Sequence, residues 1–371
     1  MVRSLTYQTP SLGTDMKLND DILEAVARHD IKLELGTGWQ AEVNPNEAWL
    51  SNESGQSICF SDHCIEYPLI NELIGANSVS SKTYPVASIA RLIDLGALRI
   101  YNQAVETSSS RFRWQDEYFS AFASPTNSLN DINQKIQKAH VVIIGIGGLG
   151  GMLALLLASA GVGRISLVDG DLVEESNLPR QFLFKESSIG KPKVDVIRDV
   201  LIAHNSKTQV TCHPQFISSR EDIEKVTKET QFLALCADQP RVKIRAWVAA
   251  TVQCMNLPSM AMASNWIGPV TIPQRSPCYF CQSRSHRNRI ADPHGFIKRA
   301  TQESTPNRAA FGPGVASVAG PMASAILHTL AGTLNSRMLT HAFRVSASGE
   351  FETQQFIRYR DCPACGNHDA K

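Results

Sequence analysis

The sequence lacks an excess of either charge. Its 371 residues carry 36 Lys and Arg against 35 Asp and Glu, a formal net charge of +1. This balance argues against a protein that relies on an overall attraction to nucleic-acid phosphates, so we expect no nucleic-acid partner. The N-terminal residues contain no apolar run typical of a signal peptide, and no stretch reaches the roughly 20 apolar residues of a membrane span. We therefore expect a cytoplasmic protein with no membrane partner.

Cysteine is present, but not in the pattern of a disulfide scaffold. Nine cysteines are an odd number, and four of them form the CxxC pairs Cys278, Cys281 and Cys362, Cys365. Four thiolates suit tetrahedral Zn²⁺, and each two-residue spacer lets one turn present both sulfurs to one metal. A redox pair is disfavoured because neither CxxC opens a helix after a thioredoxin-like strand. The pairs predict a structural Zn²⁺ site that ties the C-terminal tail to the loop after the sheet.

Residues 1–101 predict a winged-helix-like α+β domain. Alternating apolar residues flank Gly36–Gly38, and helical stretches at Tyr67–Ile74 and Val86–Leu95 precede a strand at Ala97–Tyr101. DNA binding is disfavoured because the second helical stretch, the candidate recognition helix, carries a single arginine. A dimerisation role stays open.

The polar residues 102–140 predict a linker that contains Arg111 and Arg113 and leads into a helix at Asn130–Lys138. From residue 141 to residue 371, strands and helices alternate. This alternation predicts an α/β fold with a Rossmann-like, mainly parallel sheet and right-handed crossovers. Within it, residues 283–313 are rich in Arg, His, Asn and Gly and predict a long exposed crossover loop.

A glycine-rich turn, with Gly145, Gly147, Gly148 and Gly150, joins the first strand of this domain to a helix. Glycines there allow a tight turn and let backbone N–H groups approach phosphates at the helix N-terminus. Asp169 follows at the end of the next strand, where it can accept hydrogen bonds from ribose hydroxyls. The pattern predicts nucleotide binding, but by itself it fits an NAD or FAD enzyme equally well.

The segment that follows is more specific. It contains a D-x-D…S-N-L-x-R-Q…G-x-x-K pattern formed by Asp169, Asp171, Asn177, Arg180, Gln181 and Lys193. Over roughly residues 111–366 the sequence resembles the ubiquitin-activating-like adenylating family, which includes ThiF, MoeB and MccB. The resemblance implies that Asp169 holds the ribose of ATP and that Asn177, Arg180 and Lys193 hold its triphosphate. Asp171 and Gln181 are expected in the same nucleotide site.

The resemblance also implies Mg²⁺ and a second subunit. Asp238 follows the apolar run QFLAL, and in the family an Asp here coordinates Mg²⁺, which neutralises the phosphates. An arginine upstream of the first strand reaches the γ-phosphate of the ATP bound to the partner of a homodimer. We assign that role to Arg113 rather than Arg111. The expected catalytic residues are thus Arg113, Arg180, Lys193 and Asp238.

Cysteine is absent between Cys281 and Cys362, and the sequence ends soon after the second CxxC pair, without a rhodanese-like segment. Both features argue against sulfur transfer. The N-terminal domain resembles the element that binds leader peptides of ribosomally made natural products by strand addition. We therefore expect ATP- and Mg²⁺-dependent adenylation of a precursor peptide carboxylate, such as a glutamate side chain, followed by intramolecular attack and cyclisation with loss of water. Alternatives are activation of a ubiquitin-like sulfur carrier, a tRNA-modifying dehydratase and a non-catalytic peptide-binding scaffold.

Overall fold

The structure is a computed structural model, and it divides into two compact units, residues 1–132 and residues 133–371. The predicted domain boundaries at residues 101 and 140 stay predictions. The residues that the structure describes are 28, 30–36, 39–52, 57–76, 78–95, 97–100, 110–123, 127–240, 242–263, 266–288, 311–346, 349–362 and 364–366.

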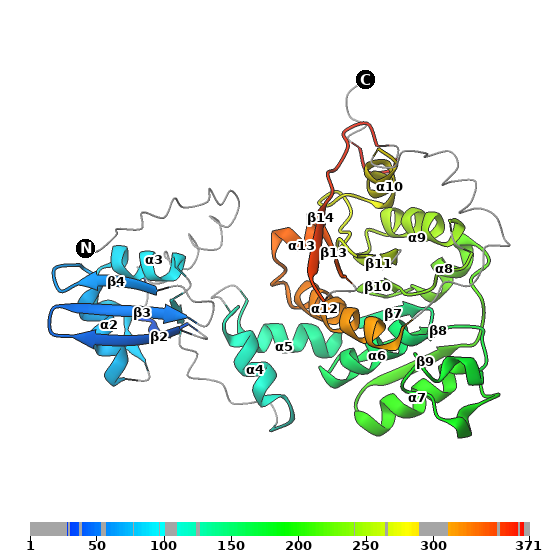
Figure 1. Ribbon diagram of the computed structural model, residues 1–371, viewed down its shortest axis with the longest axis horizontal. Coiled ribbons are helices and arrows are strands. Elements are labelled where there is room, and N and C mark those ends of the chain that lie inside the picture. Colours follow the sequence, from blue (N-terminus) through cyan, green and yellow to red (C-terminus); the bar gives the residue numbers. More distant parts are fainter. Residues whose placement is uncertain are drawn as a thin grey trace. The chain divides into compact units, whose positions relative to one another are not determined.

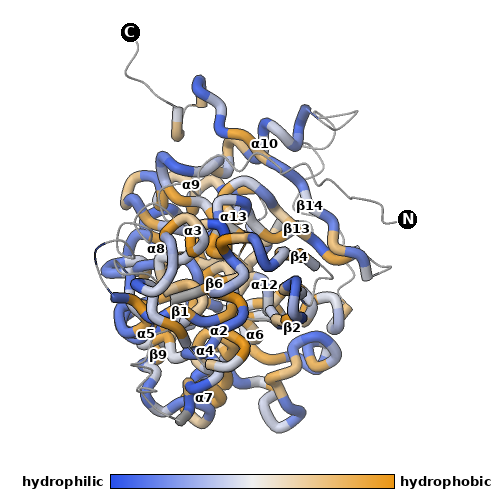
Figure 2. Tube along the Cα trace, turned by 90° about the vertical axis from the view of Figure 1, so that its left-hand side faces the viewer, coloured by the Kyte–Doolittle hydropathy of each residue, from blue (hydrophilic) through white to orange (hydrophobic). Residues whose placement is uncertain are grey.

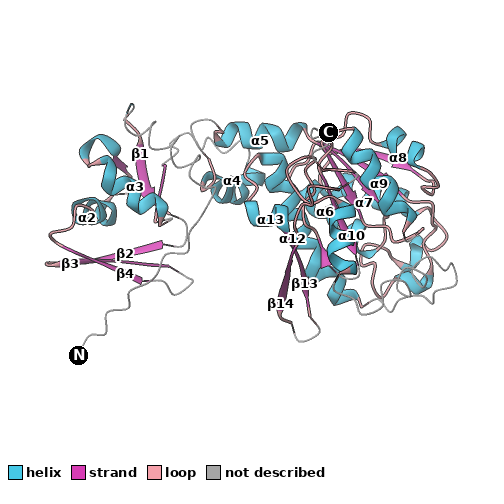
Figure 3. Cartoon of the chain, turned by 90° about the horizontal axis from the view of Figure 1, so that it is seen from above, coloured by secondary structure: helices cyan, strands magenta, loops and turns pink. Residues whose placement is uncertain are grey.

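The first unit is an α+β unit, as the sequence predicts (Figure 1). Its strands are β1 (Lys32–Leu35), β2 (Trp39–Asn44), β3 (Glu47–Asn52), β4 (Ser57–Ser61), β5 (Val79–Ser80) and β6 (Leu98–Ile100). Its helices are α2 (Tyr67–Gly75), α3 (Val86–Asp94) and α4 (Arg113–Ser120), with short 3-10 turns η1 (Ser81–Thr83) and η2 (Ser110–Phe112). The strands form two antiparallel sheets, β5-β1-β6 and β2-β3-β4 (Figure 3).

One hydrophobic core joins the two sheets of the first unit with helices α2 and α3. Leu33 of β1, Leu50 of β3, Leu69 of α2 and Ile89 of α3 are fully buried in it. Helix α3 contains both hydrophobic and hydrophilic residues (Figure 2); Ile89 and Leu92 lie in the core, whereas Arg91 is exposed. This amphipathic pattern places α3 on the surface of the unit with one face inward.

The second unit contains an eight-stranded sheet with helices. Its strands are β7 (His140–Ile144), β8 (Arg164–Val168), β9 (Gln209–His213), β10 (Phe232–Leu235), β11 (Ser259–Ala263), β12 (Trp266–Ile267), β13 (His341–Val345) and β14 (Phe351–Gln355). Its helices are α6 (Gly148–Ser159), α7 (Lys193–His204), α8 (Arg220–Val226), α9 (Lys243–Cys254), α10 (Tyr279–Arg287), α12 (Gly312–Ala331) and α13 (Ser336–Thr340), with turns η3 (Glu175–Asn177) and η4 (Glu186–Ser188). Helix α5 (Leu129–Lys138) spans the boundary between the units.

The strand order is β14-β13-β12-β11-β10-β7-β8-β9. The strands from β9 to β11 pair in parallel, which confirms the predicted mainly parallel sheet. Strands β12 to β14 extend the sheet in antiparallel fashion, an extension that the sequence analysis did not predict. The strand order reverses where β10 lies beside β7, and ligands bind outside the carboxyl ends of parallel strands at such a point.

Burial on both faces explains the continuous apolar runs of the central strands. All five residues of β7 are buried. Val142 and Ile144 pack in one cluster with Leu233, Ile223 of α8 and Ile244 of α9. Helices α6 and α12 lie side by side, and α6 also contacts β7. Strands covered on two faces are mostly apolar: β10 reads FLAL, and β7 reads HVVII, with the buried His140 as its polar residue.

Helix α12 is long and apolar enough, by length and composition, to cross a membrane, and the described residues contain no other such helix. It packs against α6 and buries Met322 and Ile326, as core helices of globular domains also do. Its length and composition are therefore weak evidence of a membrane span.

Helix α5 confirms the helix predicted at Asn130–Lys138. Helix α4 also lies within the segment predicted to be a linker. Most of the predicted crossover loop 283–313 lies outside the described residues; its first residues belong to α10 and its last ones to the start of α12.

Candidate functional site

A cavity of about 1310 Å³ opens at the carboxyl ends of the parallel strands of the second unit. Most pockets for a single small molecule measure roughly 300–1000 Å³, so this cavity can hold a nucleotide together with part of a second substrate. The predicted site residues that line it are Gly145, Gly147, Gly148, Asp169, Asp171, Arg180, Gln181, Lys193 and Asp238. Gly150 and Asn177, which were predicted in the same site, lie outside this lining.

The glycine-rich turn needs glycine for steric reasons. Gly145 has a φ of 93°, and a Cβ there would lie 2.4 Å from the backbone nitrogen of Ala237. A Cβ at Gly150 would lie 1.8 Å from the carbonyl oxygen of Gly145. Gly147 precedes α6 without any side-chain cap, so the first N–H groups of α6 are left for another acceptor. Such an uncapped helix N-terminus suits phosphate.

Asp169 is held rigidly beside this turn. Its carboxylate accepts hydrogen bonds from the backbone N–H of Ile146 at 2.6 Å and of Asp171 at 2.8 Å. Burial raises the pKa of the Asp169 carboxyl above its ordinary value, although these two N–H groups and Lys193 act in the opposite direction. Each carboxylate oxygen has a second lone pair, which leaves acceptor capacity for ribose hydroxyls. That ribose contact stays a prediction.

Lys193 and Asp171 form an ion pair that the sequence analysis did not anticipate. The Nζ of Lys193 donates to Oδ2 of Asp171 at 2.8 Å, and the backbone N–H of Lys193 donates to the Asp171 carbonyl at 3.0 Å. The Lys193 side chain is only 7% exposed, whereas that of Asp171 is 52% exposed. A phosphate that contacts Lys193 must therefore share or replace the Asp171 carboxylate.

The other two predicted phosphate ligands also have partners within the chain. Arg180 donates to the backbone carbonyl of Ser176. Asn177 is buried and caps η3, with its Oδ1 accepting from the N–H of Glu174 at 3.2 Å. Gln181 lines the cavity, and its buried Oε1 has no hydrogen-bond partner among the described residues. The structure thus gives Asn177 a capping role, and its contact with a triphosphate stays a prediction.

Asp238 follows the carboxyl end of β10, at the point in the sheet where the strand order reverses. The N–H groups of Cys236 and Ala237 both donate to the carbonyl of Ile144 at 2.8 Å, which fixes the turn after β10. Asp238 is exposed and lines the cavity, so its carboxylate is available to a cation. One carboxylate beside a phosphate site suits Mg²⁺, which keeps several waters. Burial raises the pKa of the neighbouring Cys236 thiol to about 12, so this thiol stays protonated and is a poor nucleophile.

The sequence pattern of the ThiF family matches residues 123–364, nearly two thirds of the chain. The matched residues include the glycine-rich turn, the Lys193–Asp171 pair and Asp238. The chain belongs to the ThiF family. This membership confirms the resemblance that the motif predicts.

Among curated ThiF-like relatives are adenylyltransferases. Molybdopterin-synthase adenylyltransferase of Escherichia coli (strain K12) is 33% identical over 132 residues, which cover 34% of this chain and 52% of that protein. The adenylyltransferase and sulfurtransferase uba4 of Aspergillus clavatus is 32% identical over 144 residues, 34% of this chain and 28% of that protein. The chain therefore spans about half, or less, of the length of these relatives.

Solved structures match over more of the chain. A crystal structure of E. coli MccB with ATP has a TM-score of 0.71 and 21% identity, and the match covers 91% of this chain and all of that one. A crystal structure of PaaA has a TM-score of 0.60 and 19% identity, covering 86% of this chain and 99% of that one. At these identities the matches show that the fold is shared.

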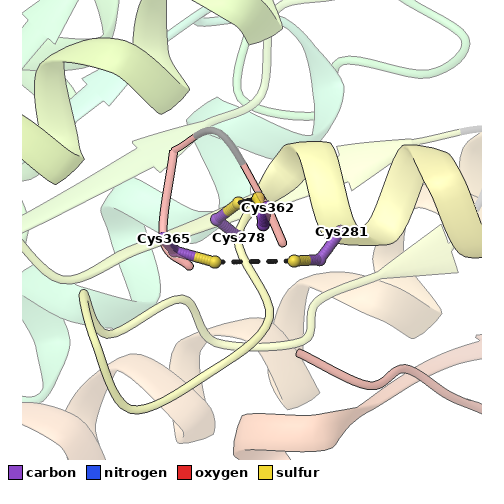
Figure 4. A group of neighbouring side chains, drawn as sticks. All are labelled: Cys278, Cys281, Cys362 and Cys365. Atoms are coloured by element: carbon purple, nitrogen blue, oxygen red, sulfur yellow. Dashed lines mark hydrogen bonds between the residues drawn. The ribbon is translucent and has the colours of Figure 1, made fainter. Parts of the chain in front are cut away.

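The two CxxC pairs of this ThiF-family chain come together as predicted (Figure 4). The four sulfurs, of Cys278, Cys281, Cys362 and Cys365, all lie within 4.8 Å of one another, and all four residues are buried. The Sγ atoms of Cys278 and Cys362 are 3.5 Å apart, as are those of Cys281 and Cys365. With Zn–S bonds of about 2.3 Å, a tetrahedral site needs sulfurs roughly 3.8 Å apart, so this donor set fits Zn²⁺.

Neighbouring groups hold the cysteine cluster in place. Arg358 donates to the carbonyl of Cys365 at 2.8 Å, and Nη1 of Arg284 lies 2.8 Å from both carboxylate oxygens of Asp361. The first CxxC pair opens a helix, α10, but no strand directly precedes it, which agrees with the expectation that this pair does not follow a thioredoxin-like strand. Burial raises the pKa of the Cys281 thiol to about 12, whereas hydrogen bonds lower that of Cys362 to about 7 against the opposing effect of burial.

The arginine segment belongs to the first unit. Arg111 lies in η2, and Arg113 begins α4 with its guanidinium over the Trp114 ring at 5.2 Å from the ring centroid. The choice of Arg113 over Arg111, and its reach to a partner subunit, stay predictions.

Proposed function

We propose that this protein adenylates a carboxylate of a ribosomally made precursor peptide, using ATP and Mg²⁺, and that the activated carboxylate is then attacked within the same peptide. The observation that carries the proposal is the extent of the match to MccB. It covers 91% of the chain and so includes most of the first unit as well as the ThiF-family region. E. coli MccB has been crystallised with ATP and with the peptide MccA.

The chemistry assigns separate tasks to the cavity residues. The N–H groups at the start of α6, with Arg180 and Lys193, bind the phosphates and stabilise negative charge on the α-phosphate. Asp169 orients the ribose. A carboxylate oxygen of the peptide attacks the α-phosphorus, and the bond to pyrophosphate breaks. Asp238 would hold Mg²⁺, which when bound would supply positive charge to offset that of the pyrophosphate.

The second step forms the product. A nucleophile of the peptide, such as an amide nitrogen, attacks the acyl carbon and AMP leaves, so the peptide loses one water overall. The pKa of about 12 for Cys236 supports direct attack rather than transfer through this cavity thiol. A glutamate side chain as the activated carboxylate is supported only by the likeness to PaaA, which extends over 86% of the chain.

The same proposal includes roles for the first unit, the cysteine cluster and Arg113. The first unit binds the leader by strand addition, and this raises the local concentration of the remaining peptide at the cavity. The cysteine cluster holds a structural Zn²⁺, and in a homodimer Arg113 reaches the partner's ATP. We also propose a cytoplasmic location.

The decisive experiment offers candidate carboxylates to the enzyme. The full chain is incubated with ATP, Mg²⁺ and the product of a small open reading frame encoded beside its gene. We expect peptide-dependent exchange of pyrophosphate into ATP, release of AMP and loss of water from the peptide by mass spectrometry. Exchange that requires no peptide, or no exchange at all with any peptide, contradicts the proposal. The absence of exchange with any carboxylate substrate favours the non-catalytic peptide-binding scaffold.

The curated relatives support a second candidate, activation of the C-terminus of a ubiquitin-like sulfur carrier. A molybdopterin-synthase adenylyltransferase and a uba4 protein match about a third of this chain at 32–33% identity, whereas the structure of MccB with ATP is 21% identical. The same exchange assay separates the candidates when a ubiquitin-like protein ending in Gly-Gly replaces the peptide. Exchange with that protein alone favours the sulfur-carrier function.

A further inference from the structure

Phe216 is an exposed aromatic residue in the wall of the nucleotide cavity. Its side chain is 68% exposed, and it follows β9 in the loop that leads to α8. It lines the cavity between Gln215 and Ile217. Single exposed apolar residues are common on protein surfaces. The exposure of Phe216 therefore matters only if the loop holds the ring in one place.

The loop does hold it. On one side, the N–H of Gln215 donates to the carbonyl of His213 at 2.8 Å. On the other side, Ile217 is buried in the core that packs α8 and α9 on the sheet. The Ser218 hydroxyl then donates to Asp222 at 2.8 Å, in the cap of α8. An exposed ring between such anchors is pre-organised, so a ligand that covers it has little conformational entropy to overcome.

The ring also lies against the acidic turn after β8. A Cβ added at Gly170 would come within 2.7–2.8 Å of three carbons of the Phe216 ring. Only a glycine therefore lets the ring approach the backbone of the Asp169–Asp171 turn so closely. Asp169, the adjacent residue, is the one proposed to hold the ribose. If the ribose of ATP binds at Asp169, the base attached to it lies next to the Phe216 ring.

We propose that Phe216 is the platform on which the base of ATP stacks. The inference rests on the proposed function, because it assumes that the cavity binds ATP with its ribose at Asp169. Aromatic rings bind bases through their faces, whichever base is present. Phe216 thus positions the nucleoside, while the glycine turn, Arg180 and Lys193 bind the phosphates. Four other aromatic residues of the described chain line the cavity from other segments: Trp266 of β12, Tyr279 of α10, Phe311 before α12 and Phe356 after β14.

The test separates base binding from phosphate binding in the full chain. Calorimetry measures the Mg²⁺ complexes of ATP and of tripolyphosphate, which has no base, with wild type, Phe216→Ala and Phe216→Trp. We expect Phe216→Ala to raise the dissociation constant for ATP about tenfold, which corresponds to about 1.4 kcal/mol. Tripolyphosphate should bind unchanged, and Phe216→Trp should bind ATP at least as tightly as wild type. Phe351→Ala is the matched control, because Phe351 on β14 is 69% exposed but does not line the cavity.

Three results would overturn the inference. They are unchanged ATP affinity in Phe216→Ala, an equal loss for ATP and tripolyphosphate, and failure of Phe216→Trp to restore binding. The second result would mean that Phe216 acts through the phosphate site or the fold. A wild-type protein that binds neither ligand would refute the proposed function itself, and the inference with it.

Discussion

The strongest quantitative prediction concerns the cysteine cluster. If Zn²⁺ joins the two CxxC pairs, it closes a loop between Cys278 and Cys362, which are 84 residues apart in sequence. For a cross-link of that span, the loss of chain entropy in the unfolded state stabilises the fold by about 4.5 kcal/mol. The exposed Arg284–Asp361 pair also holds the tail, but surface ion pairs contribute little. The double substitution Cys362→Ser, Cys365→Ser should therefore remove most of this stabilisation.

The loss is measurable as a shift of the melting temperature. In a unit of this size, 1 kcal/mol shifts Tm by about 2–4 °C, so the double variant should melt roughly 9–18 °C below wild type. Cys254→Ser is the control, because Cys254 is an exposed thiol outside the cluster. Metal analysis should find about one zinc per wild-type chain and none in the double variant. Active, freshly purified protein without zinc, or a double variant with the wild-type Tm, would show that the cluster is not a metal cross-link.

Three further predictions follow from the site and the fold. Because Asp238 is exposed, Asp238→Ala should keep the wild-type Tm while AMP formation falls at least about 100-fold, and a fully active variant would remove Asp238 as the metal ligand. Burial, aided by Arg164, lowers the pKa of His140 below its ordinary value of about 6.5, so the unfolded state binds more protons there. The contribution of neutral His140 to the free energy of unfolding should be fully present above about pH 6.5 and should fall as the pH drops below that value. His140→Gln should therefore make Tm depend less on pH in melting curves between about pH 7.5 and pH 5. Deletion of residues 1–101 should preserve ATP binding but raise the KM for the full-length peptide steeply, and unchanged kinetics would contradict leader binding by that region.

The parts of the fold that the sequence predicted are those with strong local signals. Strand β7 and helix α6 are apolar runs on either side of a glycine turn, and β7 is buried throughout. The antiparallel strands β12 to β14 escaped prediction because their signals are weak. β12 has two residues, and β14 reads FETQQ with alternate residues exposed. Pairing with a neighbouring strand, not local propensity, makes these segments extended.

In the candidate site, too, the sequence predicts some features and not others. Most of the motif residues line the cavity, because glycine turns and acidic strand ends have fixed places in this kind of sheet, but Gly150 and Asn177 lie outside the lining. The motif could not assign the partners of each residue. The motif alone gives Asn177 and Lys193 equal standing as phosphate ligands, whereas in the structure Asn177 caps η3 and Lys193 is paired with Asp171. Phe216 carries no motif at all, and only its anchored loop and the close approach to Gly170 single it out.

The charges of the cavity explain why the proposed reaction needs a metal. The described residues that line it carry three carboxylates and three permanently cationic or ammonium side chains, namely Asp169, Asp171, Asp238, Arg180, Lys193 and Arg245. The cavity is therefore close to neutral before a ligand enters. A polyphosphate would bring a large negative charge into a partly enclosed space, where uncompensated charge is costly. Lys193 alone cannot offset it, since Asp171 already neutralises that side chain at 2.8 Å. A divalent cation beside Asp238 would supply the missing positive charge, so we expect ATP without Mg²⁺ to bind weakly to this site.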